Sequence, residues 1–170
     1  MGRWIKHGGI YPTYHLRIYK KDLGRCEDRD YDQHFFVEGD TLQLDADLIE
    51  DTATTLHSWT ARHNRWAQKE ARFLADQTAK TSGDLVQPDR KGNPIERRRW
   101  VRSRILQRAP LFWRAMFYFL YRYFLRGGFL DGREGLIYHV LHGFWFRFYI
   151  DACLFEIQRE QVLAAEKEKV

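Results

Sequence analysis

The stretch Leu111-Phe112-Trp113-Arg114-Ala115-Met116-Phe117-Tyr118-Phe119-Leu120-Tyr121-Arg122-Tyr123-Phe124-Leu125-Arg126 decides how this chain is expected to fold. Arg114, Tyr118, Arg122 and Arg126 recur at four-residue steps, which predicts a helix with a stripe of cations along one face. Aromatic and aliphatic side chains occupy the other faces, and a short chain has little core in which to bury them all. A helix of this kind is typical of a membrane interface, while a buried hairpin in a soluble core is the alternative.

The segment around this helix is strongly basic. Residues 97–126 contain nine arginines and no acid, whereas the whole chain of 170 residues has 28 Lys and Arg against 23 Asp and Glu. Removing those nine leaves 19 basic groups against 23 acidic ones, so this segment supplies the entire positive excess. Near anionic lipid headgroups each arginine would contribute about 1 kcal/mol. The predicted membrane-binding residues are Arg97, Arg98, Arg99, Trp113, Arg114, Phe117, Arg122 and Arg126.

A second long helix is predicted over 133–165, after a break at Gly127-Gly128. Asp131 and Glu134 have the spacing of a capping box, and Arg147 and Asp151 are spaced to pair on one face. The two helices together predict a basic, aromatic, membrane-associating hairpin over 97–165. No run of about 18 apolar residues is present, so this hairpin is expected to lie on or dip into one leaflet rather than cross it.

The first part of the chain predicts short strands followed by a helix. Apolar residues alternate over 14–18 and 41–44, as in half-buried strands. Residues 52–78 predict an amphipathic helix, capped by Asp51 or Thr52. Glycines, prolines and few apolar residues mark 79–96 as a linker. We therefore predict an α+β chain, divided into 1–78, the linker 79–96, and the hairpin.

Several spaced blocks carry a family resemblance. In chain order they are Gly2-Arg3-Trp4-Ile5-Lys6-His7-Gly8-Gly9, Gly24-Arg25-Cys26-Glu27, Asp32-Gln33-His34, Arg62-His63-Asn64-Arg65-Trp66 and Arg126 to Leu136. They resemble the acceptor-side, C-terminal part of bacterial family-two glycosyltransferases that build cell-surface polysaccharide, lipopolysaccharide core or colanic acid. The resemblance implies part of an α/β GT-A-like fold whose donor-binding half, with its nucleotide-sugar and Mg²⁺ or Mn²⁺, is missing. We expect the chain to be inactive on its own.

The resemblance also implies catalytic residues. An inverting sugar transfer needs a carboxylate that takes the proton of the acceptor hydroxyl. Members of the family commonly have a Glu in this triplet, whereas the present chain has Gln33 between Asp32 and His34. An amide cannot accept that proton, so Asp32, His34 and Asp30 are the catalytic candidates. The alternative is an acidic loop that is solvated or paired with Arg25 and Arg29.

Candidate substrate-binding residues are Trp4, Lys6, His7, Gly8 and Gly9 in the first block, Arg17 shortly after it, and Arg62, His63 and Arg65 in the block at 62–66. Arginine suits diphosphate or lipid phosphate because its planar fork offers paired donors. The alternative is an exposed basic face with Trp66 in the core. Asp45-Ala46-Asp47 resembles a metal-binding Asp-x-Asp, but it follows the acceptor loop, so we predict no metal site in this chain.

The expected function is therefore the acceptor side of a hexosyltransferase, which passes sugar to a lipid-linked or polysaccharide acceptor at the cytoplasmic face of the inner membrane. Expected partners are that acceptor, an anionic membrane surface, and a separate donor-binding half or a second copy. Two distant cysteines favour a reducing compartment, and no signal peptide is predicted. The alternatives are a basic helical module that binds nucleic acid and a degenerate membrane scaffold.

Overall fold

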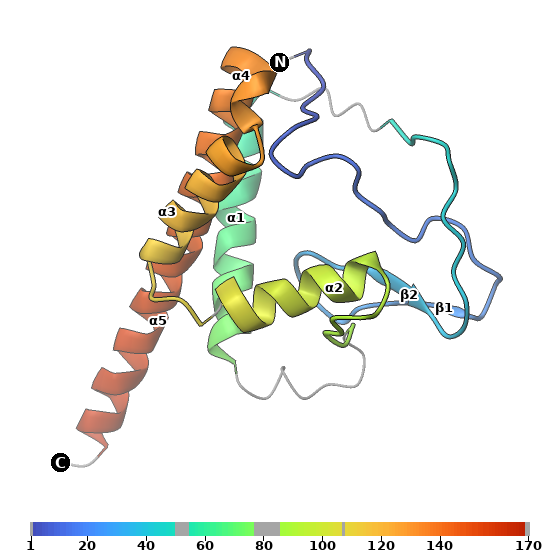
Figure 1. Cartoon of the computed structure of the whole chain (residues 1–170). Coiled ribbons are helices and arrows are strands. Elements are labelled where there is room, and N and C mark those ends of the chain that lie inside the picture. The colour runs from blue at the N-terminus through green and yellow to red at the C-terminus, as the bar shows by residue number, and fades with distance from the viewer. Residues whose placement is uncertain (1, 50–54, 77–85, 107, 169–170) are drawn as a thin grey trace.

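The computed structural model describes residues 2–49, 55–76, 86–106 and 108–168. Most of the described chain is helical, and one antiparallel pair of short strands precedes the helices in the chain (Figure 1). The α+β composition expected from the sequence is therefore confirmed. In chain order the elements are β1 (Gly24–Cys26), β2 (Phe35–Val37), α1 (Leu56–Ala75), α2 (Pro94–Val101), η2 (Arg102–Leu106), α3 (Trp113–Leu120), η3 (Tyr121–Leu125), η4 (Gly128–Asp131), α4 (Gly132–Tyr138), η5 (His139–Trp145) and α5 (Phe146–Lys167).

The two strands lie elsewhere than predicted. Gly24 of β1 pairs with Val37 of β2, and Cys26 pairs with Phe35. Residues 14–18 and 41–44 form no strand, so both strand predictions are wrong. Alternation alone does not make a strand, because a strand also needs a neighbour for its backbone hydrogen bonds.

Helix α1 confirms the helix predicted within 52–78. It begins after Thr55, whose hydroxyl oxygen accepts a hydrogen bond from the Ser58 backbone N–H at 3.1 Å. The capping positions predicted at 51 and 52 lie outside the described residues. The buried side of the helix contains His63, Ala67, Glu70 and Ala71, so it presents both an apolar stripe and two polar groups to the rest of the chain.

The single helix predicted over 97–126 is wrong. Helix α2 begins at Pro94, inside the predicted linker, behind a capping box formed by Asn93 and Glu96. Helix α3 begins only at Trp113, after Pro110, which lacks a backbone N–H, and after Phe112, whose φ is +69°. The Asp151 carboxylate stabilises this break, because it accepts a hydrogen bond from the Phe112 N–H at 2.8 Å.

The second predicted helix, 133–165, is present as α4, η5 and α5 in continuous succession. The break before it is confirmed, since Gly127 adopts a left-handed conformation with φ of +69°. The predicted capping box is wrong, because the Asp131 carboxylate makes no cap hydrogen bond. It accepts instead from the backbone N–H groups of Lys6, at 3.1 Å, and His7, at 2.8 Å.

The apolar core lies between α1 and α5. Ala67 of α1 packs with Phe146 and Ile150 of α5, and Tyr31 and Trp66 pack against them. Figure 1 shows α1 running beside α5, with α2 extending from the lower part of α1 toward the strands. Because α1 belongs to the predicted segment 1–78 and α5 to 97–165, those two segments share one core.

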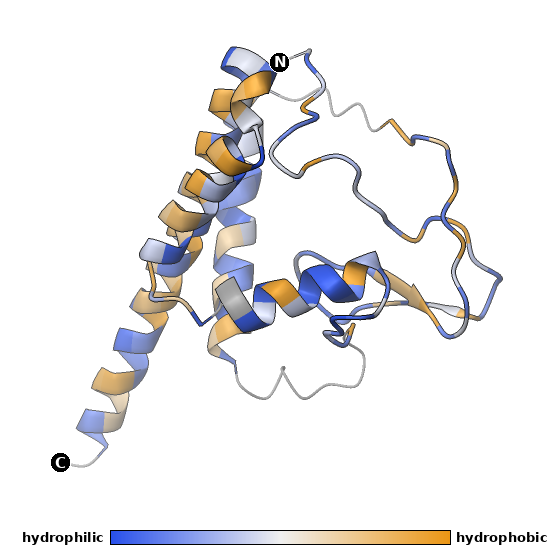
Figure 2. Cartoon of the chain, viewed as in Figure 1, coloured by the Kyte–Doolittle hydropathy of each residue, from blue (hydrophilic) through white to orange (hydrophobic). Residues whose placement is uncertain are grey.

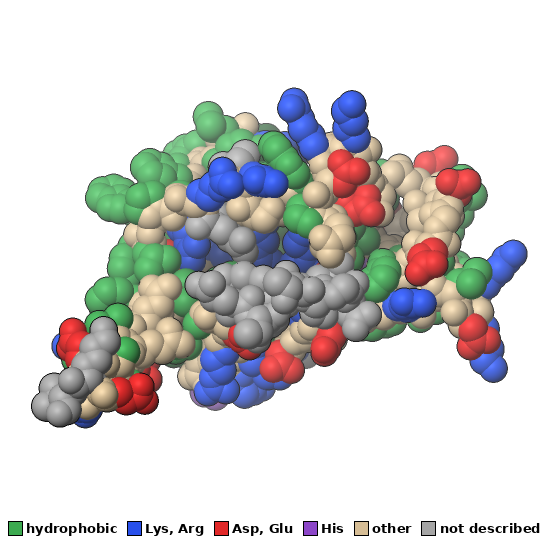
Figure 3. Space-filling view, turned by 90° about the horizontal axis from the view of Figure 1, so that it is seen from below, with side chains coloured by type: hydrophobic (Ala, Val, Ile, Leu, Met, Phe, Trp, Pro, Cys, Tyr) green, Lys and Arg blue, Asp and Glu red, His purple; other side chains and the backbone are tan. Residues whose placement is uncertain are grey.

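One face of the helices remains apolar and exposed. Figure 2 shows hydrophobic residues along α3 and the helices after it, and Figure 3 shows hydrophobic side chains gathered at the edge of the molecule where α3 and α5 lie. Its exposed large side chains include Trp113, Met116, Phe117, Leu120, Tyr121, Phe124, Leu125, Phe129 and Leu130. We call this set the aromatic face. Among the described helices, none combines the length and apolar character that a bilayer-crossing segment needs.

Candidate functional site

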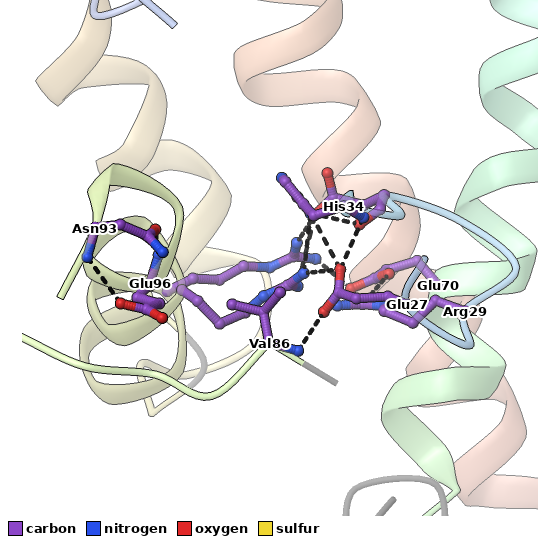
Figure 4. Close-up of polar contacts among 10 residues, drawn as sticks. Glu27, Arg29, His34, Glu70, Val86, Asn93 and Glu96 are labelled. Carbon is purple, nitrogen blue, oxygen red and sulfur yellow. Dashed lines mark hydrogen bonds and ion pairs between the residues drawn. The ribbon is translucent and has the colours of Figure 1, made fainter. Parts of the chain in front are cut away.

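A cluster of ionised side chains joins the N-terminal loop to α1 and α2. Its members are Glu27, Arg29, Asp32, His34, Glu70, Arg99 and Arg102. Figure 4 shows how Glu27 and Arg29 come from the loop after β1, while Glu70 reaches them from α1. We call this set the charge cluster. It brings the acidic loop together with Arg99, which the sequence analysis assigned to a membrane surface.

Glu27 is a structural acid at the centre of the cluster. One carboxylate oxygen accepts from the His34 backbone N–H at 2.9 Å and from Arg99 at 2.6 Å. The other accepts from the Val86 N–H at 2.9 Å. Burial alone would raise the pKa of Glu27, but the hydrogen bond with His34 and the Arg99 charge outweigh it and lower that pKa. Glu27 is therefore ionised and fully engaged.

Glu70 plays the same part on α1. Its side chain is 1% exposed and accepts from Arg29 at 2.8 Å and from Arg102. Two guanidinium groups thus neutralise one buried carboxylate, which fixes α1 to the N-terminal loop and to η2. Such a pair contributes to stability only while both partners remain in place.

Asp32 differs from both glutamates because it is open to solvent. Its side chain is 34% exposed, against 1% for Glu27 and for Glu70, and it lines a large cleft between the N-terminal segment and the helices. Arg102 lies 2.5 Å from the Asp32 carboxylate and Arg99 lies 3.8 Å from it. Burial raises the pKa of Asp32, but Arg102 outweighs burial, so the net pKa is lowered and the carboxylate stays charged at neutral pH.

The two other catalytic candidates are placed differently. His34 is buried, its Nδ1 lies 3.1 Å from Glu27 and 3.0 Å from the Asp32 backbone carbonyl oxygen, and its ring stacks on His15 at 5.8 Å. It therefore holds the loop in shape. Asp30 and Gln33 are exposed on the same loop. Of the acids in the charge cluster, Asp32 is the one that a substrate in the cleft can reach.

The first predicted substrate-binding block packs on η4 and α4, at the other end of the cleft. The Lys6 ammonium lies over the Trp4 ring at 4.2 Å, and the His7 imidazole contacts Asp131 at 2.7 Å. Gly8 donates its N–H to the Arg126 carbonyl at 2.9 Å, and Gly9 follows it beside the Arg126 side chain. This block fastens the N-terminal segment to the helices.

Arg17 is exposed and lines the same cleft as Trp4 and Gly9, on the chain between that block and the charge cluster. A role for Arg17 in substrate binding stays a prediction.

The second predicted block lies on α1. His63 is buried, its Nδ1 lies 2.8 Å from the Trp59 carbonyl oxygen, and burial lowers its pKa. Arg62 lines the cleft with its guanidinium over the Trp66 ring at 5.2 Å, whereas Arg65 is exposed. Trp66 packs against the core, as the alternative interpretation expected.

Sequence reasoning missed a group of residues on α3, α4, η5 and α5 that line the cleft: Tyr118, Tyr138, His142 and Arg147. The sequence analysis paired Arg147 with Asp151, which is wrong, because Asp151 forms its ion pair with Arg114. Arg147 instead lies 5.5 Å from the Tyr118 ring and 5.6 Å from the Phe146 ring. A usable signal existed, since arginines inside apolar helices, such as Arg122 and Arg147, need a compensating group.

The structure corrects three of the predicted membrane-facing arginines. Arg99 belongs to the charge cluster and Arg114 pairs with Asp151. Arg122 is 5% exposed and donates from Nε to the Gly8 carbonyl at 2.6 Å. The remaining members of that prediction are exposed: Arg97, Arg98, Trp113, Phe117 and Arg126.

Asp45 and Asp47 are exposed on a loop, and the Tyr11 hydroxyl donates to Asp47 at 3.0 Å. Within the described residues no group of three His, Cys, Asp or Glu side chains is placed to hold a metal ion.

Comparison with known proteins gives no relative for this chain. No protein family, no curated protein and no solved structure matches it. Its function must therefore be argued from the cleft, the charge cluster and the aromatic face.

Proposed function

We propose that this chain forms the acceptor-side part of a GT-A-like glycosyltransferase that passes a sugar from a nucleotide-sugar to a lipid-linked or polysaccharide acceptor. The observation that carries the proposal is Asp32, a charged and partly exposed carboxylate of the charge cluster that lines the cleft. The donor-binding half would come from another polypeptide segment.

In this proposal Asp32 is the general base. The acceptor hydroxyl loses its proton to the Asp32 carboxylate, the acceptor oxygen bonds to the anomeric carbon, and the nucleoside diphosphate leaves. The lowered pKa of Asp32 keeps it ionised before the reaction. Arg99 and Arg102 orient it, and His34 holds the loop from which it projects. His34 is thus a positioning residue.

The aromatic face supports a membrane-associated protein. Trp113 is 63% exposed and Phe117 is 58% exposed, and both lie on α3 beside the exposed Leu120. Contiguous apolar surface of this kind marks a surface that is covered in use, and Trp at its border suits the headgroup level. Docking on the cytoplasmic leaflet would bring the cleft to a lipid-linked acceptor.

The docking part is tested by flotation with vesicles of phosphatidylcholine containing a minority of phosphatidylglycerol. We expect the chain to float with these vesicles, and the double variant Trp113→Ser/Phe117→Ser to lose at least about tenfold in binding, because two large apolar side chains no longer insert. Leu42→Ser is the matched control, since Leu42 is exposed on a loop away from the aromatic face. Binding to single-stranded nucleic acid with no binding to vesicles would favour the nucleic-acid alternative.

The catalytic part is tested by co-expressing the chain with the donor-binding half of a family-two glycosyltransferase and measuring turnover of nucleotide-sugar. Asp32→Asn should lower the rate by about a hundredfold or more, as expected for loss of a general base. Asp30→Asn is the control on the same loop. No turnover with any donor half, or equal rates for both variants, would contradict the role of Asp32.

A further inference from the structure

Three arginines reach the cleft from three different elements without a carboxylate to neutralise them. They are Arg62 on α1, Arg122 on η3 and Arg147 on α5, and all three line the cleft. Among the residues that the structure describes, none of them forms an ion pair with Asp or Glu. The neighbouring acids Asp32 and Glu70 are already bound to Arg102.

The groups that contact these arginines directly include tyrosine and histidine side chains. The Tyr118 hydroxyl accepts from Arg122 at 3.1 Å, and the Tyr118 ring lies against Arg147. Tyr138 stacks on His142 at 5.2 Å, and His142 faces His63 at 6.0 Å. Burial, followed by the charges of Arg147 and Arg122, lowers the pKa of His142 well below its usual value, so that ring is neutral at pH 7. The carboxylates of Asp32 and Glu70 also act by charge on Arg147, but both are paired with Arg102, so the local balance is positive.

Two of the guanidinium groups have unused donors. The Nε atoms of Arg62 and Arg147 are buried and have no hydrogen-bond partner among the described residues. Burial raises the pKa of Tyr118, but Arg147 and Arg122 outweigh burial and lower it, which indicates a strongly positive field at its hydroxyl. Buried charges without a counter-ion are costly, and buried donors are normally satisfied. A bound anion would meet both requirements.

We propose that Arg62, Arg122 and Arg147 together bind a diphosphate group in the cleft, with the Tyr118 hydroxyl as a further donor. Arginine presents paired N–H donors in a plane, which matches the oxygens of phosphate. Three guanidinium groups would neutralise the charges of one diphosphate. Binding of a diphosphate does not depend on the proposed function. Only the choice of the molecule that carries it, a lipid-linked acceptor or a nucleoside diphosphate, rests on that function.

The site is tested by isothermal titration calorimetry of the full chain with inorganic pyrophosphate at neutral pH. We expect Arg147→Met and Arg62→Met each to weaken binding about tenfold or more, because each removes a charge-assisted hydrogen bond. Arg147→Lys should bind with intermediate affinity, because it keeps the charge and loses the fork. Arg159→Met is the control, since Arg159 is exposed further along α5. Absence of binding, or equal affinity in wild type and Arg147→Met, would overturn the site.

The protein's own response to pyrophosphate provides a second measurement that does not depend on any variant. A ligand that binds only the folded chain raises its thermal midpoint as ligand concentration increases. We expect pyrophosphate to raise this midpoint for the wild type, and sodium chloride of equal ionic strength to leave it lower. Equal midpoints in the two salts would count against the site even if Arg147→Met failed to fold.

The source of the diphosphate is distinguished with vesicles of phosphatidylcholine that contain either a polyprenyl diphosphate or the corresponding polyprenol. A lipid source predicts stronger flotation with the diphosphate lipid, and loss of that increment in Arg147→Met. Pyrophosphate binding without this increase in flotation assigns the site to a nucleoside diphosphate.

The same measurements separate the two proposals. If the chain docks on vesicles but does not bind pyrophosphate, the site is wrong while the membrane proposal stands. If pyrophosphate binds but the chain does not dock on any vesicle, the membrane proposal is wrong while the site stands.

Discussion

The arginines of α2 and η2 and those of η3 and α5 look alike in the sequence, but the structure treats them in opposite ways. Arg99 and Arg102 point into the charge cluster, where Glu27, Asp32 and Glu70 neutralise them. Arg122 and Arg147 point into the cleft, where they meet tyrosine, histidine and backbone carbonyl oxygen. The first set is complete without a ligand, and the second is not.

This difference separates structural charges from candidate binding charges. A buried cation with a buried carboxylate holds elements together, and removing either partner leaves the other uncompensated. A buried cation without a carboxylate contributes little to the folded state on its own and gains only when an anion arrives. Mutation should therefore lower the free energy of unfolding much more in the first set than in the second, which the following predictions test in order of decreasing effect.

Loss of a carboxylate from the charge cluster should have the largest effect. In Glu70→Gln the guanidinium groups of Arg29 and Arg102 lose their shared negative partner, so we expect the free energy of unfolding to fall by about 3–5 kcal/mol. Urea denaturation measures this change. Glu38→Gln is the control, because its pair with Arg25 is exposed and should change stability by no more than about 0.5 kcal/mol. Similar losses in the two variants would show that burial does not distinguish these pairs.

A methyl group at Gly8 should disturb the backbone whose carbonyl oxygen accepts a hydrogen bond from Arg122. A Cβ at this position would lie 2.1 Å from Cε1 of the buried His139 ring, and φ is +70°. We expect Gly8→Ala to lower the free energy of unfolding by about 3 kcal/mol, from strain and overlap together.

Gly9→Ala is the matched control for this change. Gly9 has a φ of +71°, but its nearest neighbour would be 3.8 Å from the new Cβ, so only the conformational cost of about 1 kcal/mol remains. Equal losses in the two alanine variants would mean that the contact of Gly8 with His139 is not close.

Acid should lower the free energy of unfolding because the buried His139 is neutral in the folded chain. Burial, together with the charge of Arg122, lowers the pKa of His139 to about 4. In the unfolded chain His139 has the ordinary histidine pKa of about 6.5. Between the two pKa values the unfolded chain therefore binds a proton that the folded chain does not bind. The contribution of His139 to the free energy of unfolding should therefore be complete above pH 6.5 and fall by about 1.4 kcal/mol per pH unit between pH 6.5 and 4.

His139→Leu should reduce the slope of the profile between pH 6.5 and 4, as measured by urea denaturation across the pH range, while His142 and His63, whose pKa values are also lowered, still contribute. His57→Leu, at an exposed position in the first turn of α1, should keep the wild-type slope. An unchanged slope in His139→Leu would assign the acid sensitivity to other groups.

The smallest effect on stability is expected for Arg147→Met. This change removes a buried charge that has no ion pair among the described residues and keeps most of its apolar volume, so the loss of its ring contacts and the relief of desolvation should nearly cancel. Urea denaturation should give a change within about 1 kcal/mol. Arg102→Met, in contrast, should cost several kcal/mol, at the scale of a broken buried pair. A large loss in Arg147→Met would show that Arg147 is structural as well.

Local patterns in the sequence predicted what depends on neighbours along the chain. Helix α1 follows from the spacing of Trp59, His63, Trp66 and the residues between them, and the turn at Gly127 follows from the residue type that its positive φ favours. Trp113 and Phe117 are exposed, as expected for a short chain that has more aromatic side chains in this helix than its core can bury. These features depend on residues within a few positions of one another.

Contacts between residues that are far apart in the sequence could not be predicted from it. The four-residue spacing suggested that Arg147 binds Asp151, but Asp151 lies beneath the turn at Phe112 and is used there, with Arg114. Asp32 could be chosen as a candidate, yet nothing near it in the chain shows that arginines about 70 residues away would surround it. The pairing of a charge is decided by packing, which composition and periodicity do not record.

The carboxylate of Asp131 has a consequence for how the chain would be cut by proteases. It accepts hydrogen bonds from the backbone N–H groups of Lys6 and His7 and contacts the His7 imidazole. One side chain at the start of α4 therefore holds the N-terminal residues against the helices. Trypsin should spare the bond after Lys6 in the wild type and cut it readily in Asp131→Ala. The released tail would be a short peptide that ends at Lys6, while Gly8 stays with the rest of the chain beside His139.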